Sequence, residues 1–338
     1  MSPTGRSRIV QIHPTRRCNL RCLHCYSSSG PEERGELAAA LLSDALTDAA
    51  AQGYTVASFS GGEPTLYRPL PELLAHAHRL GLLTTVTSNG MLLDSRRLAR
   101  LSGVIDLLAI SLDGVPESHD RMRADPTAFA TMASRLDGVR RSGIPFGFIF
   151  TLTQHNLDEL FWVADFALAE GARLLQIHPL EQAGRALERL PEARPDHVEA
   201  SYAFLVARDL QERFGDRLQV QLDLAPHRKM EGEPCRFFAG KAPAAPEIPF
   251  SHLLSPLIVE ADGTVVPVEY GFARRFALGN LHQARLAELA PRWRQERYPE
   301  FQSLCRDAFA AFAADPETPL LNWYEAVRQA SNAVPAPA

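Results

Sequence analysis

Three cysteines stand close together near the start of the chain: Cys18, Cys22 and Cys25, in the spacing Cys-x3-Cys-x2-Cys. Thiolate sulfur is the usual protein ligand of iron–sulfur clusters, and closely spaced cysteines on one loop reach several irons of one cluster. Three thiolates on a four-iron cluster leave one iron without a protein ligand. The pattern therefore predicts a [4Fe–4S] cluster with one iron open to a small chelating molecule.

Three other uses of these cysteines compete with this interpretation. Reduced structural cysteines are usually buried, whereas this segment is rich in arginine. A zinc site needs a fourth ligand, for which His13 or Cys235 are candidates, because His24 stands between two of the cysteines. A closed structural cluster needs a fourth cysteine nearby, and none precedes Cys235. The open-site cluster is favoured.

The segment Cys18–Tyr26 reads Cys-Asn-Leu-Arg-Cys-Leu-His-Cys-Tyr and resembles the signature of the radical S-adenosylmethionine (SAM) superfamily. The resemblance runs from about Ile9 to Leu180, and more weakly through Leu281. It is similar to the branch with coenzyme and peptide maturases, haem-pathway enzymes and anaerobic sulfatase activators. The resemblance implies one [4Fe–4S] cluster with SAM at the open iron. It also implies reductive cleavage of SAM to a 5′-deoxyadenosyl radical, which abstracts hydrogen from a substrate, with a flavodoxin or ferredoxin as electron donor.

Four further motifs follow in the order that the superfamily has them. Ser60-Gly61-Gly62-Glu63-Pro64 and Thr87-Ser88-Asn89-Gly90 each follow an expected strand, as does Ser111-Leu112-Asp113-Gly114, and His119-Asp120-Arg121-Met122-Arg123 comes last. The resemblance implies that SAM is contacted by the following residues: Gly61, Gly62, Glu63, Pro64, Ser88, Asn89, Ser111 and Arg123. Arg123 is preferred over Arg121 for the SAM carboxylate, which a guanidinium group suits.

Each of these motifs also has a plainer structural interpretation. Gly61–Pro64 also fits a tight turn with an exposed glutamate, and Asp113-Gly114 is a common turn element. Arg123 is alternatively a surface arginine. His178, at the end of an expected strand, either faces the substrate or adenine, or is structural.

The C-terminal half resembles the SPASM or twitch domain of the same superfamily, in which further cysteines bind auxiliary clusters. The cysteine expected after Val266-Pro267 is replaced by Val268, and only Cys235 and Cys305 remain in this half. Two thiols do not supply a four-cysteine set, so we expect no auxiliary cluster. Both thiols are then expected to be small buried hydrophobic groups, with Cys235 as a less favoured hydrogen donor to a substrate radical.

Short apolar runs alternate with amphipathic segments and predict the elements that position these motifs. Strands are predicted at 8–12, 55–59, 83–87, 107–112, 146–152, 174–178 and 218–224, with a hairpin of 257–260 and 264–268 around Asp262-Gly263. Helices are predicted at 37–51, 70–80, 95–101, 127–142, 157–170 and 196–214, and two more close the chain. Because parallel strands end at one rim, the motifs are expected to meet there.

The fold class predicted is α/β, a partial (β/α)6 barrel like part of a TIM barrel, with a smaller α+β C-terminal domain. The predicted boundaries are a flexible N-terminus (1–8), a radical SAM core (9–185), a linker and helix (186–234), a degenerate SPASM/twitch-like domain (235–305), and a C-terminal helix with a disordered tail (306–338).

Composition limits the class of partner. The net charge of −5 over 338 residues gives no basic footprint for nucleic acid. No apolar run reaches the roughly 20 residues of a membrane helix, and no signal peptide is evident, so a cytoplasmic location is predicted. The substrate is expected to be a peptide or a small molecule such as a sugar or nucleotide. Because few residues precede Cys18, a peptide is expected to need a separate recognition protein or direct binding.

Overall fold

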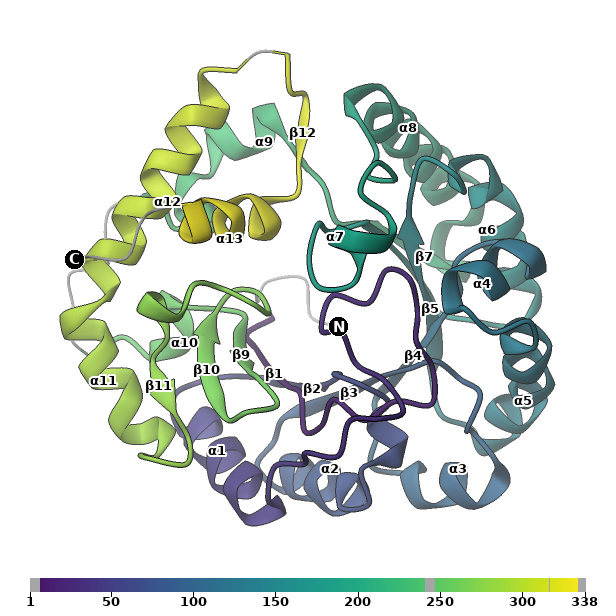
Figure 1. Ribbon diagram of the computed structural model, residues 1–338, viewed down its shortest axis with the longest axis horizontal. Helices are drawn as coiled ribbons and strands as arrows, with labels where there is room; N and C mark the ends of the chain where they lie inside the picture. Colours follow the sequence, from purple (N-terminus) through teal and green to yellow (C-terminus); the bar gives the residue numbers. More distant parts are fainter. Residues whose placement is uncertain (1–6, 241–246, 316, 334–338) are drawn as a thin grey trace.

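The protein is described here by a computed structural model that covers residues 7–240, 247–315 and 317–333. Two sequence expectations, the flexible N-terminus and the disordered tail, lie wholly or partly outside these residues. Within the described part of the chain, one ten-stranded sheet has the strand order β11-β10-β9-β1-β2-β3-β4-β5-β6-β7. The strands form an arc around the centre of the molecule (Figure 1).

The first seven strands along the chain lie side by side in this sheet and pair in parallel with one another. They are β1 (Ile9–Ile12), β2 (Val56–Phe59), β3 (Leu83–Ser88), β4 (Leu107–Ser111), β5 (Phe146–Leu152), β6 (Leu174–Pro179) and β7 (Gln219–Leu222). The α/β class with a parallel sheet is thus confirmed. The apolar runs located β1 to β6 well because a strand that is covered on both faces must be apolar along much of its length.

Helices cover the outer side of the arc (Figure 1). They are α1 (Ala39–Ala51), α2 (Leu70–Arg79), α3 (Ser95–Leu101), α4 (Pro116–Arg123), α5 (Ala128–Ser142), α6 (Leu160–Ala169) and α8 (His197–Phe214), whereas the short helix α7 (Ala186–Arg189) lies inside the arc (Figure 1). The short helix α4 was not predicted, since its sequence Pro-Glu-Ser-His-Asp-Arg-Met-Arg has no apolar periodicity. Its proline stands at the first helical position, where the missing N–H costs nothing.

The repeat of strand and helix continues beyond residue 185, where the predicted core ends. Helix α8 begins at a capping box: the Asp196 side chain accepts hydrogen bonds from the backbone N–H groups of Val198 and Glu199, and the Glu199 side chain accepts from Asp196 N. The helix leads into β7, which pairs in parallel with β6. The predicted strand therefore exists, but it belongs to the sheet of the core.

The C-terminal part adds strands to the other edge of the sheet. The predicted hairpin is confirmed as β9 (Leu257–Val259) and β10 (Thr264–Pro267), and β9 pairs in parallel with β1. The remaining elements are β8 (Ala225–Pro226), α9 (His227–Gly232), α10 (Phe250–Leu253), β11 (Gly279–Asn280), α11 (Leu286–Glu296), α12 (Tyr298–Ala313), β12 (Leu320–Leu321) and α13 (Trp323–Ala333). After the hairpin, the described residues contain three helices (α11, α12 and α13) longer than one turn rather than the predicted two.

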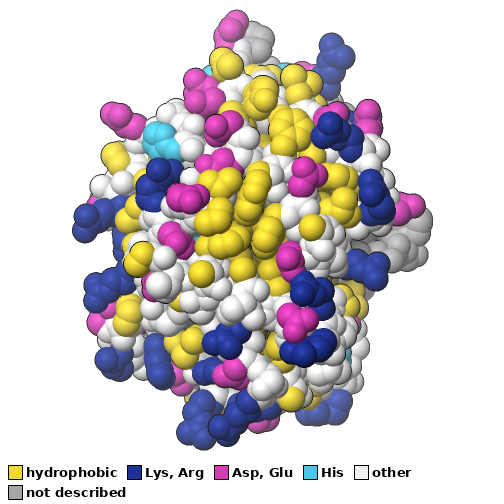
Figure 2. All heavy atoms as spheres, turned by 90° about the vertical axis from the view of Figure 1, so that its right-hand side faces the viewer, with side chains coloured by type: hydrophobic (Ala, Val, Ile, Leu, Met, Phe, Trp, Pro, Cys, Tyr) yellow, Lys and Arg dark blue, Asp and Glu magenta, His cyan; other side chains and the backbone are white. Residues whose placement is uncertain are grey.

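The outer surface has one notable apolar feature. Figure 2, seen from the right-hand side of Figure 1, shows hydrophobic side chains gathered near the middle of this face. On α8, Val198, Tyr202 and Leu205 are exposed at positions i, i+4 and i+7, which lie on one side of a helix.

In the residues that the structure describes, no helix combines the length and the apolar character that crossing a membrane requires.

The capping box of α8 generates a prediction about stability. Asp196→Ala leaves two backbone N–H groups without their acceptor and should lower the free energy of unfolding by about 1 kcal/mol. Urea denaturation followed by circular dichroism measures this change. Glu192→Ala, which removes an exposed carboxylate just before the helix, should change it much less. Equal effects of the two substitutions would contradict a capping role.

Candidate functional site

The three predicted metal ligands lie on the long loop that follows β1, in the centre of the arc (Figure 1). This loop folds back on itself: Cys18 N donates to Gly30 O (3.1 Å) and Gly30 N donates to Arg16 O (3.2 Å). Leu23 N also donates to Met122 O (2.9 Å), which attaches the loop to α4. Cys18 and Cys22 are buried and Cys25 is half-buried, so the triad is held inside the barrel rather than at the surface.

Each sulfur of the triad faces an N–H donor. Leu20 N lies 3.5 Å from Cys18 Sγ, Arg123 Nη1 lies 3.7 Å from Cys22 Sγ, and Ser29 N lies 3.3 Å from Cys25 Sγ. Such donors stabilise thiolates and cluster sulfur, so the residues present fit an iron–sulfur cluster. Burial raises the pKa of the Cys18 thiol to about 12, and also that of Cys22, so binding of a metal must release protons.

The arrangement of the thiols also bears on the zinc alternative. Among the described residues, no three His, Cys, Asp or Glu side chains converge as ligands of a single metal ion. Zinc requires such convergence, whereas the thiolates of a cubane bind different irons. Metal analysis of the purified protein distinguishes the two.

The Gly61-Gly62 segment packs directly on the loop of the triad. Gly62 N donates to Thr15 O and Glu63 N donates to Arg17 O, each over 2.9 Å. A Cβ added to Gly62 would lie 2.2 Å from Arg17 O, and Gly61 has φ of +111°. The two glycines therefore allow the backbone of the triad loop to approach this segment closely. The contact of this segment with SAM remains a prediction.

Glu63 joins three of the predicted motifs. Its carboxylate is completely buried and accepts four hydrogen bonds, from Thr65 N, Thr65 Oγ1, Ser88 Oγ and Asn89 N, over 2.7–3.1 Å. Asn89 in turn donates to Asn19 Oδ1 (2.8 Å), between the first two cysteines. An exposed glutamate on a turn was the plainer alternative, and it is wrong. Pro64, which is itself buried, begins a 3-10 turn (η1, Pro64–Leu66) after it.

Arg123 lies beside the triad. Its Nε is 2.7 Å from Asp113 Oδ2, and both side chains are buried. Burial alone would raise the pKa of Asp113, but the charges of Arg123, His24 and His119 and a hydrogen bond from Thr151 N together lower it to about 2. The surface alternative for Arg123 is therefore wrong. The contact of Arg123 with the SAM carboxylate remains a prediction. Ser111 is buried at the end of β4, and its role also remains a prediction.

Arg185 is a functional candidate that the sequence analysis missed. Its Nη1 donates to Cys22 O (2.7 Å), its Nη2 to Ser29 O (2.8 Å), and its backbone N to Cys25 O (2.9 Å). Three donors from the loop after β6 thus hold three carbonyls of the triad loop. No family motif marks this arginine, so only its place after an apolar strand could have drawn attention to it.

The predictions for the C-terminal cysteines have a mixed outcome. Cys305 is buried in α12, as expected, whereas Cys235 is exposed on a 3-10 turn (η4, Pro234–Phe237). The prediction that Cys235 is a buried hydrophobic group is therefore wrong, because η4 is a short turn that packs only one side against α9 and α12. No contact described for Cys235 joins it to the triad loop, and its role as a hydrogen donor stays a prediction.

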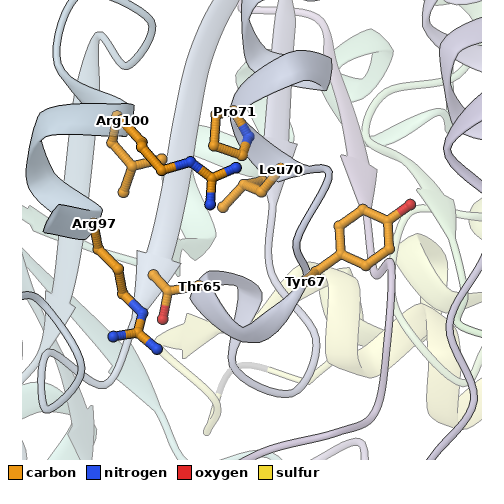
Figure 3. Close-up of a pocket in the computed structure, with 7 residues that line it drawn as sticks. Thr65, Tyr67, Leu70, Pro71, Arg97 and Arg100 are labelled. Atoms are coloured by element: carbon orange, nitrogen blue, oxygen red, sulfur yellow. The ribbon is translucent and has the colours of Figure 1, made fainter.

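A pocket between η1, α2 and α3 lies next to the Glu63 segment (Figure 3). Arg97 and Arg100 line it, but Arg97 pairs with Asp94 (2.6 Å) and Arg100 donates to Arg68 O (3.1 Å). Both guanidinium groups are engaged within the protein, so we do not assign this pocket to the site.

The four bonds of Glu63 generate a prediction. Glu63→Ala leaves four donors in the interior without an acceptor, at a cost of about 1–3 kcal/mol for each donor that stays unsatisfied. The variant should melt well below the wild type in differential scanning calorimetry. Glu117→Ala, an exposed position on α4, serves as the control. An unchanged melting temperature for Glu63→Ala would show that the carboxylate does not hold the loops together.

The contacts of Arg185 generate a prediction about the mobility of the triad loop. Arg185→Ala removes two donors from the triad loop and should speed amide hydrogen exchange within residues 22–29, as measured by mass spectrometry. Arg189→Ala, one turn further along at an exposed position, should leave this exchange unchanged. If both variants exchange like the wild type, Arg185 does not restrain the loop.

Comparison with known proteins extends these observations. Residues 12–167 match the model of the Radical SAM superfamily. Fe-coproporphyrin III synthase of Methanosarcina barkeri is 33% identical over 186 residues, which are 54% of this chain and 47% of that protein. The PqqA peptide cyclase of Ruegeria pomeroyi is 28% identical over 256 residues, 75% of this chain and 65% of that protein. The chain spans about half to two thirds of the length of these curated relatives.

The fold is also similar to that of solved structures. The crystal structure of Streptococcus suis SuiB bound to S-adenosylmethionine matches with a TM-score of 0.68 at 17% identity, covering 88% of this chain and 68% of that one. The superfamily uses a [4Fe–4S] cluster and SAM, and the cysteine loop with its N–H donors fits the cluster. The cysteine motif and most of the parallel sheet fall within residues 12–167, the segment of the chain that matches the radical SAM superfamily.

Proposed function

We propose that this protein is a radical SAM enzyme in which Cys18, Cys22 and Cys25 hold one [4Fe–4S] cluster. The observation that carries the proposal is the convergence of the motifs: the loops after β1, β2, β3 and β4 are joined to one another by buried hydrogen bonds. When bound, the cluster and SAM supply the electron and the carbon-centred radical that abstracts hydrogen from a substrate.

The residues of this chain would position and enclose these groups. Gly61, Gly62, Glu63 and Pro64, together with Ser88 and Asn89, are proposed to line the SAM pocket; Ser111 and Arg123 are proposed for the ribose and carboxylate end. All four of Ser88, Asn89, Ser111 and Arg123 are buried, and Asn89 and Arg123 face sulfurs of the triad, which supports this assignment. A buried guanidinium group next to Cys22 also keeps a positive charge beside the thiolates.

A peptide is the first candidate for the substrate, and a small molecule is the alternative. The match with the PqqA peptide cyclase covers 256 residues, more than the predicted core of residues 9–185, so it includes part of the C-terminal half. The match with Fe-coproporphyrin III synthase is more identical but shorter, and it favours a small molecule. Epimerisation, decarboxylation, dehydrogenation and bond formation are all reactions of the class proposed.

The cysteine triad gives the decisive experiment. Cys22→Ala should lose the cluster, which is expected at about four irons per chain, and with it all formation of 5′-deoxyadenosine from SAM after reduction with dithionite. Iron analysis and chromatography of the nucleoside measure these outcomes. Cys235→Ala, at an exposed thiol outside the triad, should keep the iron content of the wild type.

The same measurements separate the proposal from a protein of another class. Zinc without iron in the purified wild type would identify a zinc protein. Iron and sulfide without any cleavage of SAM would identify a non-catalytic sensor or scaffold. Retention of both cluster and 5′-deoxyadenosine formation in Cys22→Ala would refute the assignment of the ligands.

A further inference from the structure

The loop that follows β6 packs directly on the backbone of the triad loop. A Cβ added to Gly184 would overlap the carbonyl oxygens of Cys25 and Tyr26, so glycine is required for this approach. Gly184 also has φ of +54°, a conformation that residues with a side chain rarely adopt. The next residue is Arg185, whose backbone N donates to Cys25 O (2.9 Å). The backbone of Arg185 therefore touches that of a predicted metal ligand.

The side chain of Arg185 spans two more carbonyls of the same loop. Its Nη1 donates to Cys22 O (2.7 Å) and its Nη2 to Ser29 O (2.8 Å). A guanidinium group presents its donors in a rigid planar fork, so it bridges two acceptors in a fixed geometry that a lysine ammonium group does not impose. Ser29 N donates in turn to Cys25 Sγ (3.3 Å). Arg185 is thus connected to two of the three predicted ligands.

The partners of Arg185 are carbonyl oxygens, and none of them is a carboxylate. Among the residues that the structure describes, no Asp or Glu lies within ion-pair distance of its guanidinium group. A carbonyl accepts a hydrogen bond but has no net charge to cancel that of arginine. The side chain is half-buried, so water and salt screen its charge less than that of an exposed arginine. The positive charge of Arg185 therefore acts on the interior of the barrel.

The other arginines near the cysteines are paired with carboxylates. Arg123 Nη1 faces Cys22 Sγ over 3.7 Å, but its Nε lies 2.7 Å from Asp113 Oδ2. Burial raises the pKa of the Cys22 thiol, Arg123 lowers it, and Asp113 acts against Arg123. Three arginines that stand beside the cysteines in the sequence pair with glutamates of the same loop: Arg16 with Glu33 (3.3 Å), Arg17 with Glu36 (3.7 Å) and Arg21 with Glu32 (2.7 Å). The effect of each of these cations on the triad is therefore largely offset.

The other titratable groups beside the triad add no positive charge. Burial raises the pKa of the Cys18 thiol, and the Glu63 carboxylate, which has no cationic partner among the described residues, raises it further. Burial lowers the pKa of His24 to about 4 and that of His119 to about 3, so both rings are neutral near pH 7. Arg185 is therefore the cation beside the triad whose charge no carboxylate of the described residues offsets.

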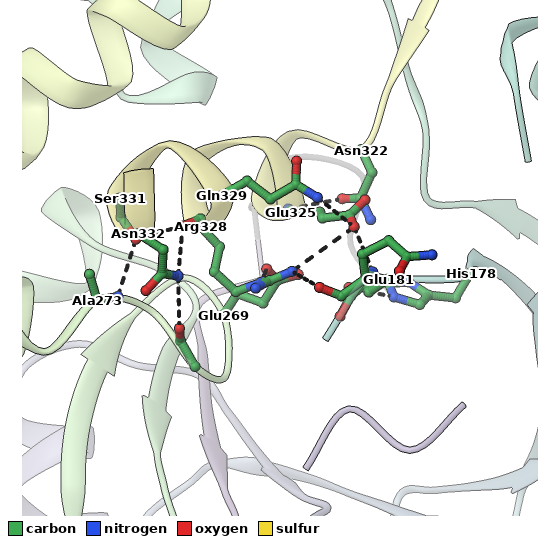
Figure 4. A network of polar contacts seen from close by, with 12 residues as sticks. His178, Glu181, Glu269, Ala273, Asn322, Glu325, Arg328, Gln329, Ser331 and Asn332 are labelled. Atoms are coloured by element: carbon green, nitrogen blue, oxygen red, sulfur yellow. Dashed lines mark hydrogen bonds and ion pairs between the residues drawn. The ribbon is translucent and has the colours of Figure 1, made fainter. Parts of the chain in front are cut away.

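Helix α13 holds the loop of Arg185 from its other side (Figure 4). Gln182 N donates to Glu325 Oε1 (2.9 Å), and Arg328 Nη2 donates to Gln182 O (3.3 Å). Arg328 Nε also lies 2.6 Å from Glu269 Oε2, which fixes the arginine itself. Because the backbone before Arg185 is attached to α13 and Arg185 N to the triad loop, the guanidinium group is kept in place beside the cysteines.

We propose that Arg185 is a positioning residue that favours reduction of the cluster by supplying the positive charge that no carboxylate offsets. The inference rests on the proposed function, in which Cys18, Cys22 and Cys25 hold one [4Fe–4S] cluster. Three thiolates outweigh the charge of the oxidised cubane, so the site is already negative before an electron arrives. One electron from the external donor adds a further negative charge, and no bond is formed or broken. A fixed positive charge nearby stabilises the reduced state more than the oxidised one.

The reduction potential of the cluster tests the charge. The full chain is loaded with its cluster without oxygen and without SAM, and is titrated with dithionite and redox mediators. Electron paramagnetic resonance measures the reduced cluster. At the midpoint potential of the wild type, Arg185→Gln should lower the ratio of reduced to oxidised cluster about fivefold or more, a shift of about 40 mV for one electron. Arg185→Lys keeps the charge and should change this ratio less than about twofold.

Amide hydrogen exchange separates the charge from the contacts. Both substitutions remove the fork that bridges Cys22 O and Ser29 O, so both should speed exchange within residues 22–29. Only Arg185→Gln should also lower the reduction potential. Arg189→Gln, at an exposed position on α7, is the control and should change neither the exchange nor the potential.

Two results would overturn the role of the charge. One is an Arg185→Gln variant with the iron content and the midpoint potential of the wild type, and the other is an equal drop in potential in Arg185→Lys and Arg185→Gln. If Arg185→Gln does not retain the cluster, Arg185→Met takes its place. Loss of the cluster from both neutral variants but not from Arg185→Lys supports a need for charge. Loss from all three overturns it, because the contacts alone would explain that result.

Failure of this inference is distinct from failure of the proposed function. Formation of 5′-deoxyadenosine from SAM is measured on the same preparations. Wild type without iron would refute the proposed function and this inference with it, whereas loaded wild type that does not cleave SAM would refute only the radical SAM activity. Equal potentials in the wild type and Arg185→Gln, with 5′-deoxyadenosine formed by the wild type, would refute the inference alone.

Discussion

The interior of the barrel depends on one buried carboxylate, that of Glu63. It has no cationic partner among the described residues and is held by four hydrogen bonds from two loops. Removing a carboxylate from water is costly, and burial indeed raises the pKa of Glu63. The cost is offset only when all four donors are in place at once. The segments after β2 and β3 therefore order together, and Asn89 extends this constraint to Asn19 in the loop of the triad.

On the opposite side of the barrel, polar contacts of helix α13 take the place of strand pairing. The sheet ends at β7 on one side and at β11 on the other, and α13 lies between them (Figure 1). Glu325 accepts from Gln182 N, after β6, and Ser331 Oγ accepts from Ala273 N, beyond β10. A helix with these polar contacts on one face can join two sheet edges that do not meet. These contacts hold the loop after β6, at Gln182, and the segment beyond β10, at Ala273, against the same helix.

Much of this arrangement could be predicted from local sequence, and the reasons for success and failure are physical. The strands β1 to β6 are apolar because helices cover the sheet, and the triad spacing belongs to a single loop. In contrast, α4 has no apolar stripe, and the parallel pairing of β7 with β6 depends on contacts that no local pattern encodes. Arg185 acts through backbone carbonyls, which every residue has, so its partners leave no trace in the sequence.

The turn at Val268 shows why position within a motif is not enough to assign a role. The resemblance led to an expected cysteine there, and its absence alone suggested only a lost cluster. The left-handed backbone of Val268 has a further consequence, because it returns the chain to the rim where β1 and β6 end. A strained conformation persists when surrounding contacts hold it, here the Arg328–Glu269 pair and the stack of Tyr270 on His13. The strained turn at Val268 therefore accompanies the placement of Glu269 beside Arg328 and of Tyr270 beside His13.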